Sequence, residues 1–158
     1  SRKASIFGGI ELPPNQHGVL QYVPPKLLER LPFFSATSSQ GTYYLSRRLF
    51  EMYHIQPEIS MELINTTTAY RLAPESKGFA LAPVSVTYEE QFHPEPIFCS
   101  MEEKPTVRTM GLLYKRNRQL SYGAQRFIDL AAREIPKFVE EHIPRFEVRH
   151  DIDFSSLL

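Results

Sequence analysis

The chain has 158 residues, of which 42% are hydrophobic and 23% charged, which is typical of one compact domain or two small lobes and not of a disordered segment. Basic and acidic residues are balanced at 18 each, so no overall field would attract nucleic acid or an anionic membrane. The single cysteine, Cys99, excludes an internal disulfide and, with no apolar run long enough to cross a bilayer, leads us to expect a cytoplasmic protein.

The first half of the chain is predicted to alternate between strands and helices. Apolar residues recur at helical spacing over residues 42–54, and polar and apolar residues alternate strictly over residues 58–63, which predicts a strand with one buried face. The predicted elements are a strand at 18–23, a helical turn at 26–31, a strand at 31–35, the helix at 42–54, the strand at 58–63 and a helix at 69–73 that Pro74 ends or kinks.

The second half is predicted to continue the alternation. Strands are expected at residues 78–82, 96–101 and 106–114, and a helix with a core-packing apolar face begins at Ser121. Pro136 is expected to start another short helix, followed by an extension over residues 145–158 that docks on a partner or is loosely ordered. This order predicts a mainly parallel, doubly wound α/β fold, in which ligands gather at the carboxyl ends of the strands.

Two polar segments are expected at that edge, residues 35–41 and 65–68. Each leads from a strand into a helix, where free backbone N–H groups and the macrodipole favour an anion or a carbonyl oxygen. The hydroxyls of Ser35, Thr37, Ser38, Thr66 and Thr67 would orient such a ligand. The alternative is that Ser38, Ser39 and Asn65 are ordinary helix N-caps without a ligand.

No catalytic or metal-binding motif is found. The serines between residues 35 and 46 form no Gly-x-Ser-x-Gly elbow, the five histidines have no metal-ligand spacing, and no phosphate-binding glycine motif occurs, so neither catalytic residues, nor a metal, nor a cofactor is predicted. Cys99 lies in an apolar stretch and is expected to be a buried, inert thiol. The basic run at residues 115–118 is interpreted as a solvated loop.

Two stretches, residues 70–83 and 110–130, resemble the effector-binding domain of LysR-type transcriptional regulators. Gly78, the apolar residues 79–82 and Pro83 match the latter part of a family segment, whereas Ser76 stands where that family usually has its first glycine. The second stretch resembles the family's closing strand, its polar loop with Leu120-Ser121 and its final helix. Residues 33–35 and 53–57 are similar to the entry into the family's second lobe, so the resemblance covers about residues 31–134.

The resemblance implies a two-lobed fold like the type 2 periplasmic binding proteins, with a small-molecule effector, such as a carboxylate, held between the lobes. It implies a homodimer or tetramer, in which the helix at 42–54 and its residues Tyr43, Arg47 and Arg48 lie on the subunit surface. DNA would be contacted only through a winged helix-turn-helix domain that this chain lacks. The positions that match effector-binding places are Ser35, Ala36, Thr37, Asn65, Thr66 and Thr67.

The resemblance divides the chain into four parts. Residues 1–31 are expected to be the end of the first lobe and the hinge, 32–105 the second lobe, 106–135 a return to the first lobe and 136–158 a C-terminal extension. Only about thirty residues precede Pro32, too few for a complete first lobe, so we expect a chain that starts at a cut. Two alternatives stay open, namely a solute-binding protein or enzyme on the same fold, and a pure oligomerisation module.

Overall fold

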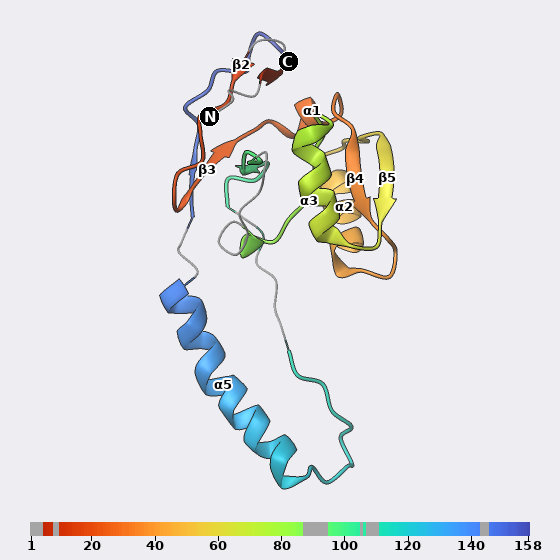
Figure 1. The fold of residues 1–158 in the computed structure, drawn as a ribbon, viewed down its shortest axis with the longest axis vertical. Helices are drawn as coiled ribbons and strands as arrows, with labels where there is room; N and C mark the ends of the chain where they lie inside the picture. Colours follow the sequence, from red (N-terminus) through yellow and green to blue (C-terminus); the bar gives the residue numbers. More distant parts are fainter. Residues whose placement is uncertain (1–4, 8–9, 87–94, 105, 107–110, 143–145) are drawn as a thin grey trace.

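A computed structural model of the chain describes residues 5–7, 10–86, 95–104, 106, 111–142 and 146–158 (Figure 1). The elements in chain order are β1 (Ser5–Phe7), β2 (Ile10–Glu11), β3 (Val19–Tyr22), α1 (Pro25–Leu28), β4 (Phe33–Ala36), α2 (Gly41–Met52), β5 (Ile59–Leu63), α3 (Thr66–Glu75), β6 (Cys99–Ser100), α5 (Tyr122–His142) and β7 (Glu147–Arg149). The predicted α/β class is therefore confirmed.

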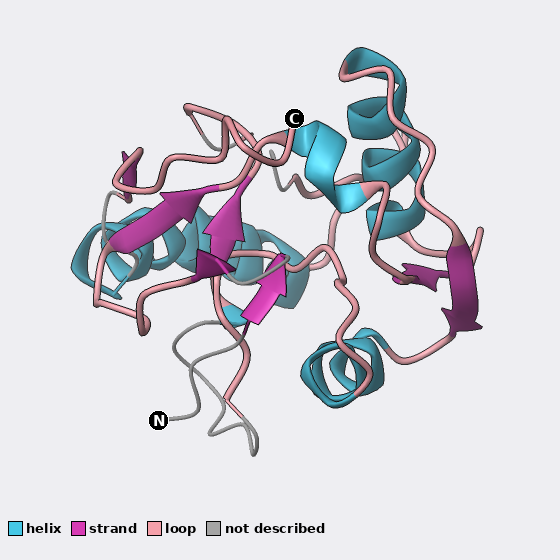
Figure 2. Ribbon diagram, turned by 90° about the horizontal axis from the view of Figure 1, so that it is seen from above, coloured by secondary structure: helices cyan, strands magenta, loops and turns pink. Residues whose placement is uncertain are grey.

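The strands form three small sheets, and Figure 2 shows them in separate groups. β3 lies between β6 and β7 and pairs parallel with both, and β4 pairs parallel with β5. The predicted parallel pairing is confirmed in these two sheets, whereas β1 and β2 pair antiparallel.

The unit β4–α2–β5–α3 is the best-formed part of the fold. β4 lies at its centre, because β5 pairs with one edge of β4 and Phe79 makes a parallel bridge to Phe33 on the other. Successive residues of a strand point to opposite faces. Phe33 packs with Phe50 of α2, and Phe34 packs in a second cluster with Tyr70 of α3, so the two helices cover opposite faces of the sheet.

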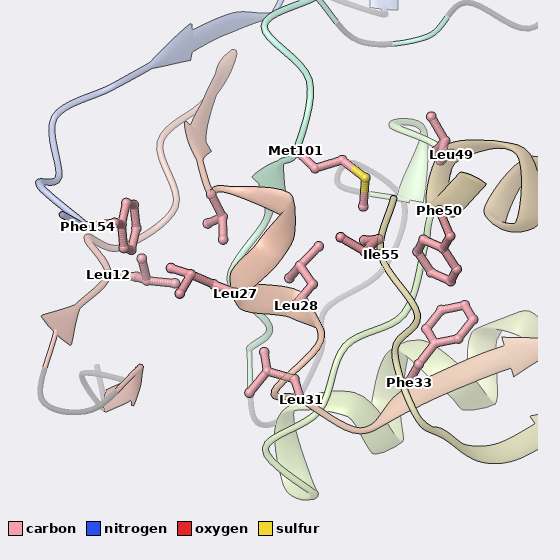
Figure 3. Packing of buried hydrophobic residues seen from close by; sticks show 11 residues of the cluster. Leu12, Leu27, Leu28, Leu31, Phe33, Leu49, Phe50, Ile55, Met101 and Phe154 are labelled. Atoms are coloured by element: carbon pink, nitrogen blue, oxygen red, sulfur yellow. The ribbon is translucent and has the colours of Figure 1, made fainter. Parts of the chain in front are cut away.

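One hydrophobic cluster joins the two parallel sheets (Figure 3). Leu27 and Leu28 of α1 lie in its middle, between Phe154 from the C-terminal segment and the residues contributed by the α2 side. α1 begins with Pro25, whose fixed φ suits the first helical position. The cluster consists of Leu12, Val23, Leu27, Leu28, Leu31, Phe33, Leu49, Phe50, Ile55, Met101 and Phe154.

The C-terminal segment differs from its prediction. Instead of a loosely ordered extension, residues 147–149 form β7, which pairs with β3, and Phe154 is buried. The helix before it also differs, because α5 runs through Pro136 to His142 without a break. Three of the six residues after Pro136 in α5 are the good helix formers Lys137, Glu140 and Glu141, which favours continuation of the helix past the lost backbone hydrogen bond.

Several predicted strands are shorter than expected. Residues 78–82 contribute only the bridge at Phe79, and residues 96–101 only the two-residue strand β6. Gly111–Tyr114 form no strand, and residues 107–110 of that prediction lie outside the described residues. Pro74 lies inside α3, which ends one residue later at Glu75.

Two burial predictions were wrong. Cys99 is exposed instead of buried. The apolar face of β5 is also exposed, with 40% of Ile59 and 47% of Met61 accessible to solvent, because β5 is the edge strand and α2 packs mainly over β4. The basic residues 115–118 are all exposed, as predicted for a solvated loop.

Candidate functional site

The structure places the two predicted polar segments at the same edge of the β4–β5 sheet. Ser35 lies opposite Glu62, and Ala36 lies opposite Leu63, in a parallel register. Parallel strands end at the same edge, so the turn after β4 and the turn after β5 are neighbours. Residues 35–37 and 65–67, which we call the sheet-edge site, are thereby brought together.

Gln40 joins the two turns. Its side-chain oxygen accepts a hydrogen bond from the backbone N–H of Thr37 at 3.3 Å, and its side-chain nitrogen donates to the backbone C=O of Ile64 at 2.5 Å. Gln40 was not among the six positions predicted from the sequence, which were chosen for hydroxyls, for a capping amide and for backbone N–H groups. Gln40 could have been predicted from its place directly before Gly41, the first residue of α2. Its side-chain amide can both donate and accept a hydrogen bond, so it can join two neighbouring turns.

The six predicted residues do not share one environment. Ser35 and Ala36 are buried, with exposed fractions of 1% and 7%, and the Ser35 hydroxyl donates to the C=O of Ala36 at 2.9 Å. Thr37, Thr66 and Thr67 are half-buried, and Thr37 Oγ1 lies 3.0 Å from Ser39 Oγ. Among these six residues the threonines therefore carry the hydroxyls accessible to a ligand, whereas Ser35 is enclosed; Ser38, also predicted to orient a ligand, is exposed in the same turn.

The two helix starts at this edge are capped differently. Asn65 is the N-cap of α3, and its side chain accepts a hydrogen bond from the Thr67 N–H at 2.9 Å, so the predicted capping contact of Asn65 is present. The N-cap of α2 is Gln40, not Ser38 or Ser39, and Gln40 makes no side-chain cap hydrogen bond. The first turn of α2 thus keeps backbone donors that no capping side chain satisfies.

We expect Gln40→Ala to lower the free energy of unfolding by about 1 kcal/mol, because two modest hydrogen bonds are lost while the exposed turns can rebond to water. The carboxylate of Gln40→Glu can still accept the hydrogen bond from the Thr37 N–H, but its second oxygen lies against the carbonyl oxygen of Ile64. We therefore expect Gln40→Glu to lower the free energy of unfolding as well. Urea denaturation of both variants checks this. An unchanged midpoint for Gln40→Ala would mean that the bridge does not hold the two turns together.

A groove that the sequence analysis did not predict lies between α2 and the β4–β5 sheet. It has a volume of about 680 Å³, within the range of small-molecule pockets, and combines an apolar floor with charged side chains at its rim. Its lining residues are Phe33, Ser35, Ser46, Arg47, Phe50, Glu51, His54, Ile55, Gln56, Pro57 and Ile59. They come mainly from the C-terminal half of α2 and the approach to β5, and Ser35 is the one residue of the sheet-edge site among them.

One side of this groove is tied to α1. Glu29 accepts a hydrogen bond from the Gln56 N–H at 2.8 Å and pairs with Lys26. Both contacts lower the pKa of the Glu29 carboxyl, with Lys26 the larger cause. On α2, the Arg47 guanidinium lies over the ring of Tyr43 at 5.3 Å, and Tyr43 is half-buried and not exposed as expected.

Among the described residues, no group of three or more His, Cys, Asp or Glu side chains is placed to hold a metal ion. A search of the same residues finds no helix with both the length and the hydropathy that crossing a membrane requires.

Comparison with known proteins identifies the family. The model of the LysR substrate binding domain matches residues 12–136, more than half of the chain and a segment that includes the whole sheet-edge site. No curated protein and no solved structure matches the chain. The chain therefore belongs to the LysR substrate binding domain family, the effector-binding domain of LysR-type regulators.

Proposed function

We propose that this chain is the effector-sensing domain of a LysR-type transcriptional regulator, and that a small polar molecule binds at the sheet-edge site. The observation that carries the proposal is the pairing of the two polar turns after β4 and β5, bridged by Gln40, within the segment that matches the family. In this proposal the domain binds its effector without converting it. DNA is contacted by a winged helix-turn-helix domain outside this chain.

The chemistry of the site favours a ligand with a carboxylate or another hydrogen-bond acceptor. The first turn of α2 offers backbone N–H groups and the positive end of the helix macrodipole. The hydroxyls of Thr37, Thr66 and Thr67 can donate to or accept from the same ligand. The Ser35 hydroxyl already donates to the C=O of Ala36, and the Asn65 side-chain oxygen already accepts from Thr67, so in this proposal Ser35 and Asn65 mainly hold the turns in place.

The two-lobed arrangement is part of the proposal. The β4–β5 unit would be the second lobe, within residues 32–105, and the β3 sheet would belong to the first lobe, with residues 1–31 leading from its end to the hinge. Residues 106–135 would return to the first lobe, and 136–158 would follow as the extension. Effector binding between lobes would change their separation, and DNA binding would respond to that change.

We also propose that α2 and β5 form a surface between subunits of a homodimer or tetramer. Ile59 and Met61 of β5 and Tyr44 and Met52 of α2 are large apolar side chains exposed by 40% to 64%. The same observation favours the second candidate function, an oligomerisation module that binds no small molecule. A solute-binding protein or an enzyme on this fold has no specific support in the described residues.

The test is a thermal-shift and calorimetric screen of the chain against small organic acids and amino acids. A ligand that binds only the folded state at one hundred times its dissociation constant stabilises the protein by about 2.7 kcal/mol. We expect Thr66→Ala and Thr37→Ala each to weaken binding of the hit by about tenfold, or about 1.4 kcal/mol, because each removes one hydrogen bond to the ligand.

Thr68→Ala is the matched control, since Thr68 is an exposed threonine in the first turn of α3 and lies two residues from Thr66. Its side chain points about 200° away from that of Thr66 around the helix, so binding should be unchanged. A screen without hits on folded protein would reject the sensing function and favour the oligomerisation module. Unchanged binding in Thr37→Ala and Thr66→Ala, or the same loss in these variants as in Thr68→Ala, would contradict the sheet-edge site.

A further inference from the structure

The groove between α2 and the β4–β5 sheet has an apolar floor. Phe33, Phe50 and Ile55 line it and are all buried. The rings of Phe33 and Phe50 face each other in Figure 3, with centroids 5.0 Å apart and an edge-to-face arrangement. A floor of this kind suits the apolar or aromatic group of a small molecule.

Two opposite charges lie one helical turn apart at the rim of this groove. Arg47 and Glu51 are four residues apart in α2, so their side chains leave the same side of the helix. The Arg47 guanidinium lies over the ring of Tyr43 at 5.3 Å, one turn toward the N-terminus. Within the described part of the chain, neither Arg47 nor Glu51 forms an ion pair. Each charge is therefore open to a charged group of a ligand.

Buried hydroxyls add polar acceptors inside the groove. Ser46 and Ser35 line it and are 2% and 1% exposed. The Ser46 hydroxyl donates to the C=O of Tyr43 at 2.7 Å, and the Ser35 hydroxyl donates to the C=O of Ala36 at 2.9 Å. A hydroxyl that has donated its hydrogen still has lone pairs. Both oxygens can therefore accept a hydrogen bond from an N–H group of a ligand.

The C-terminal end of α2 places a histidine at the groove in a conformation that favours glycine. His54 has a φ of 52°, follows the C-cap Tyr53 and lines the groove. The N–H of Ile55 donates to the C=O of Phe50 at 2.9 Å, which is the hydrogen bond of a Schellman motif. Glycine is the usual residue at this position of the motif. A larger residue held there often marks a ligand site.

We propose that this groove is a second binding site, for a small zwitterion with an apolar side chain, that is, an apolar amino acid. Arg47 binds its carboxylate, and Glu51 binds its ammonium group. The apolar floor holds the side chain, and the His54 imidazole forms a wall of the groove. The site does not rest on the proposed function, and Ile59 is the one lining residue that it shares with the proposed subunit surface.

Calorimetry of the whole chain with related probes tests the zwitterion. The probes are L-phenylalanine, 3-phenylpropionate, which lacks the ammonium group, and 2-phenylethylamine, which lacks the carboxylate. We expect L-phenylalanine to bind about tenfold more tightly than either analogue, because each analogue loses one charge-assisted hydrogen-bonding group. Equal binding of all the probes, or no binding of L-phenylalanine to the folded chain, would overturn the proposal.

Charge-removing variants assign each group of the ligand to its partner. Arg47→Gln should weaken binding of L-phenylalanine about tenfold without weakening that of 2-phenylethylamine. Glu51→Gln should weaken binding of both amines without weakening that of 3-phenylpropionate. Arg48→Gln is the matched control, because Arg48 is an exposed arginine about 100° around α2 from Arg47 and outside the groove lining. The same loss in Arg48→Gln as in Arg47→Gln would contradict the site.

His54→Gly separates a role in binding from a role in folding. Glycine is favoured at this φ, so the urea midpoint should stay the same or rise. Binding of L-phenylalanine should nevertheless fall about threefold, because one wall of the groove is lost. An unchanged affinity would overturn the assignment of His54 to the site.

The sheet-edge variants distinguish the two sites. Thr37→Ala and Thr66→Ala should leave binding of L-phenylalanine unchanged, because neither threonine lines the groove. If they weaken it while Arg47→Gln and Glu51→Gln do not, the amino acid binds at the sheet-edge site. The groove proposal would then fail and the sensing function would stand.

Discussion

Phe33→Ala should lower the free energy of unfolding by about 3–5 kcal/mol, a large part of the 5–15 kcal/mol that stabilises a typical domain. Phe33 is 2% exposed, and its ring lies 5.0 Å from that of Phe50 and 4.9 Å from that of Phe79. The ring therefore joins β4 to α2 and to the segment that pairs with the other edge of β4. Its removal leaves a cavity where three parts of the fold meet.

Two variants bracket this result in urea denaturation. Phe33→Leu keeps most of the volume and should cost less than half as much as the alanine substitution. Leu113→Ala removes a side chain that is 101% exposed and should stay within about 0.5 kcal/mol of the native chain. A loss below 1 kcal/mol for Phe33→Ala would show that this part of the chain is not a close-packed core.

The sequence predicted the local elements well where each had its own periodic pattern. α2 and β5 lie within two residues of their predicted bounds, because an apolar face at 3.6-residue spacing and strict alternation are local signals. The pattern of β5 did not reveal that Ile59 and Met61 are exposed. Exposure of an edge strand depends on what lies over the sheet, and that is a tertiary property.

The pairing of strands that are far apart in the chain could not be predicted from the sequence. β7 was predicted as a loose extension because three residues carry too little pattern, yet they pair with β3 more than a hundred residues earlier. Parallel partners far apart in the chain are chosen by the packing of the whole fold. The same limit explains why the face of α5 was predicted to pack in the core of this chain, although none of its side chains between residues 122 and 141 is buried.

For the sheet-edge site, one general rule predicted that the two turns are neighbours: parallel strands end at the same edge of their sheet. The rule did not separate accessible hydroxyls from buried ones, so Ser35 was placed with Thr37 and Thr66 although its side chain is enclosed. It also missed Gln40, because its two hydrogen bonds exist only after the turns are neighbours. Accessibility and bridging contacts follow from the fold and are not written in any short motif.

Gly78→Ala should also be strongly destabilising, for a reason of space and not of backbone conformation. A Cβ atom at this position would lie 2.5 Å from the carbonyl oxygen of Pro32 and 2.7 Å from Cε2 of Phe34. The carbonyl accepts the Phe79 N–H at 2.9 Å, so moving it breaks the pairing with β4. We expect a loss of about 1–3 kcal/mol, typical of overpacking, with a larger value if the bridge at Phe79 opens.

Gly123→Ala is the matched control, because a Cβ atom there has no neighbour within 4 Å. Alanine is also the better helix former in α5, so the stability should be unchanged or slightly higher. If both alanine variants unfold at the same urea concentration as the native chain, the close approach of residue 78 to β4 is absent in solution. The apolar segment after α3 would then lie away from the sheet, and Phe33 and Phe34 would lose their covering neighbour on that edge.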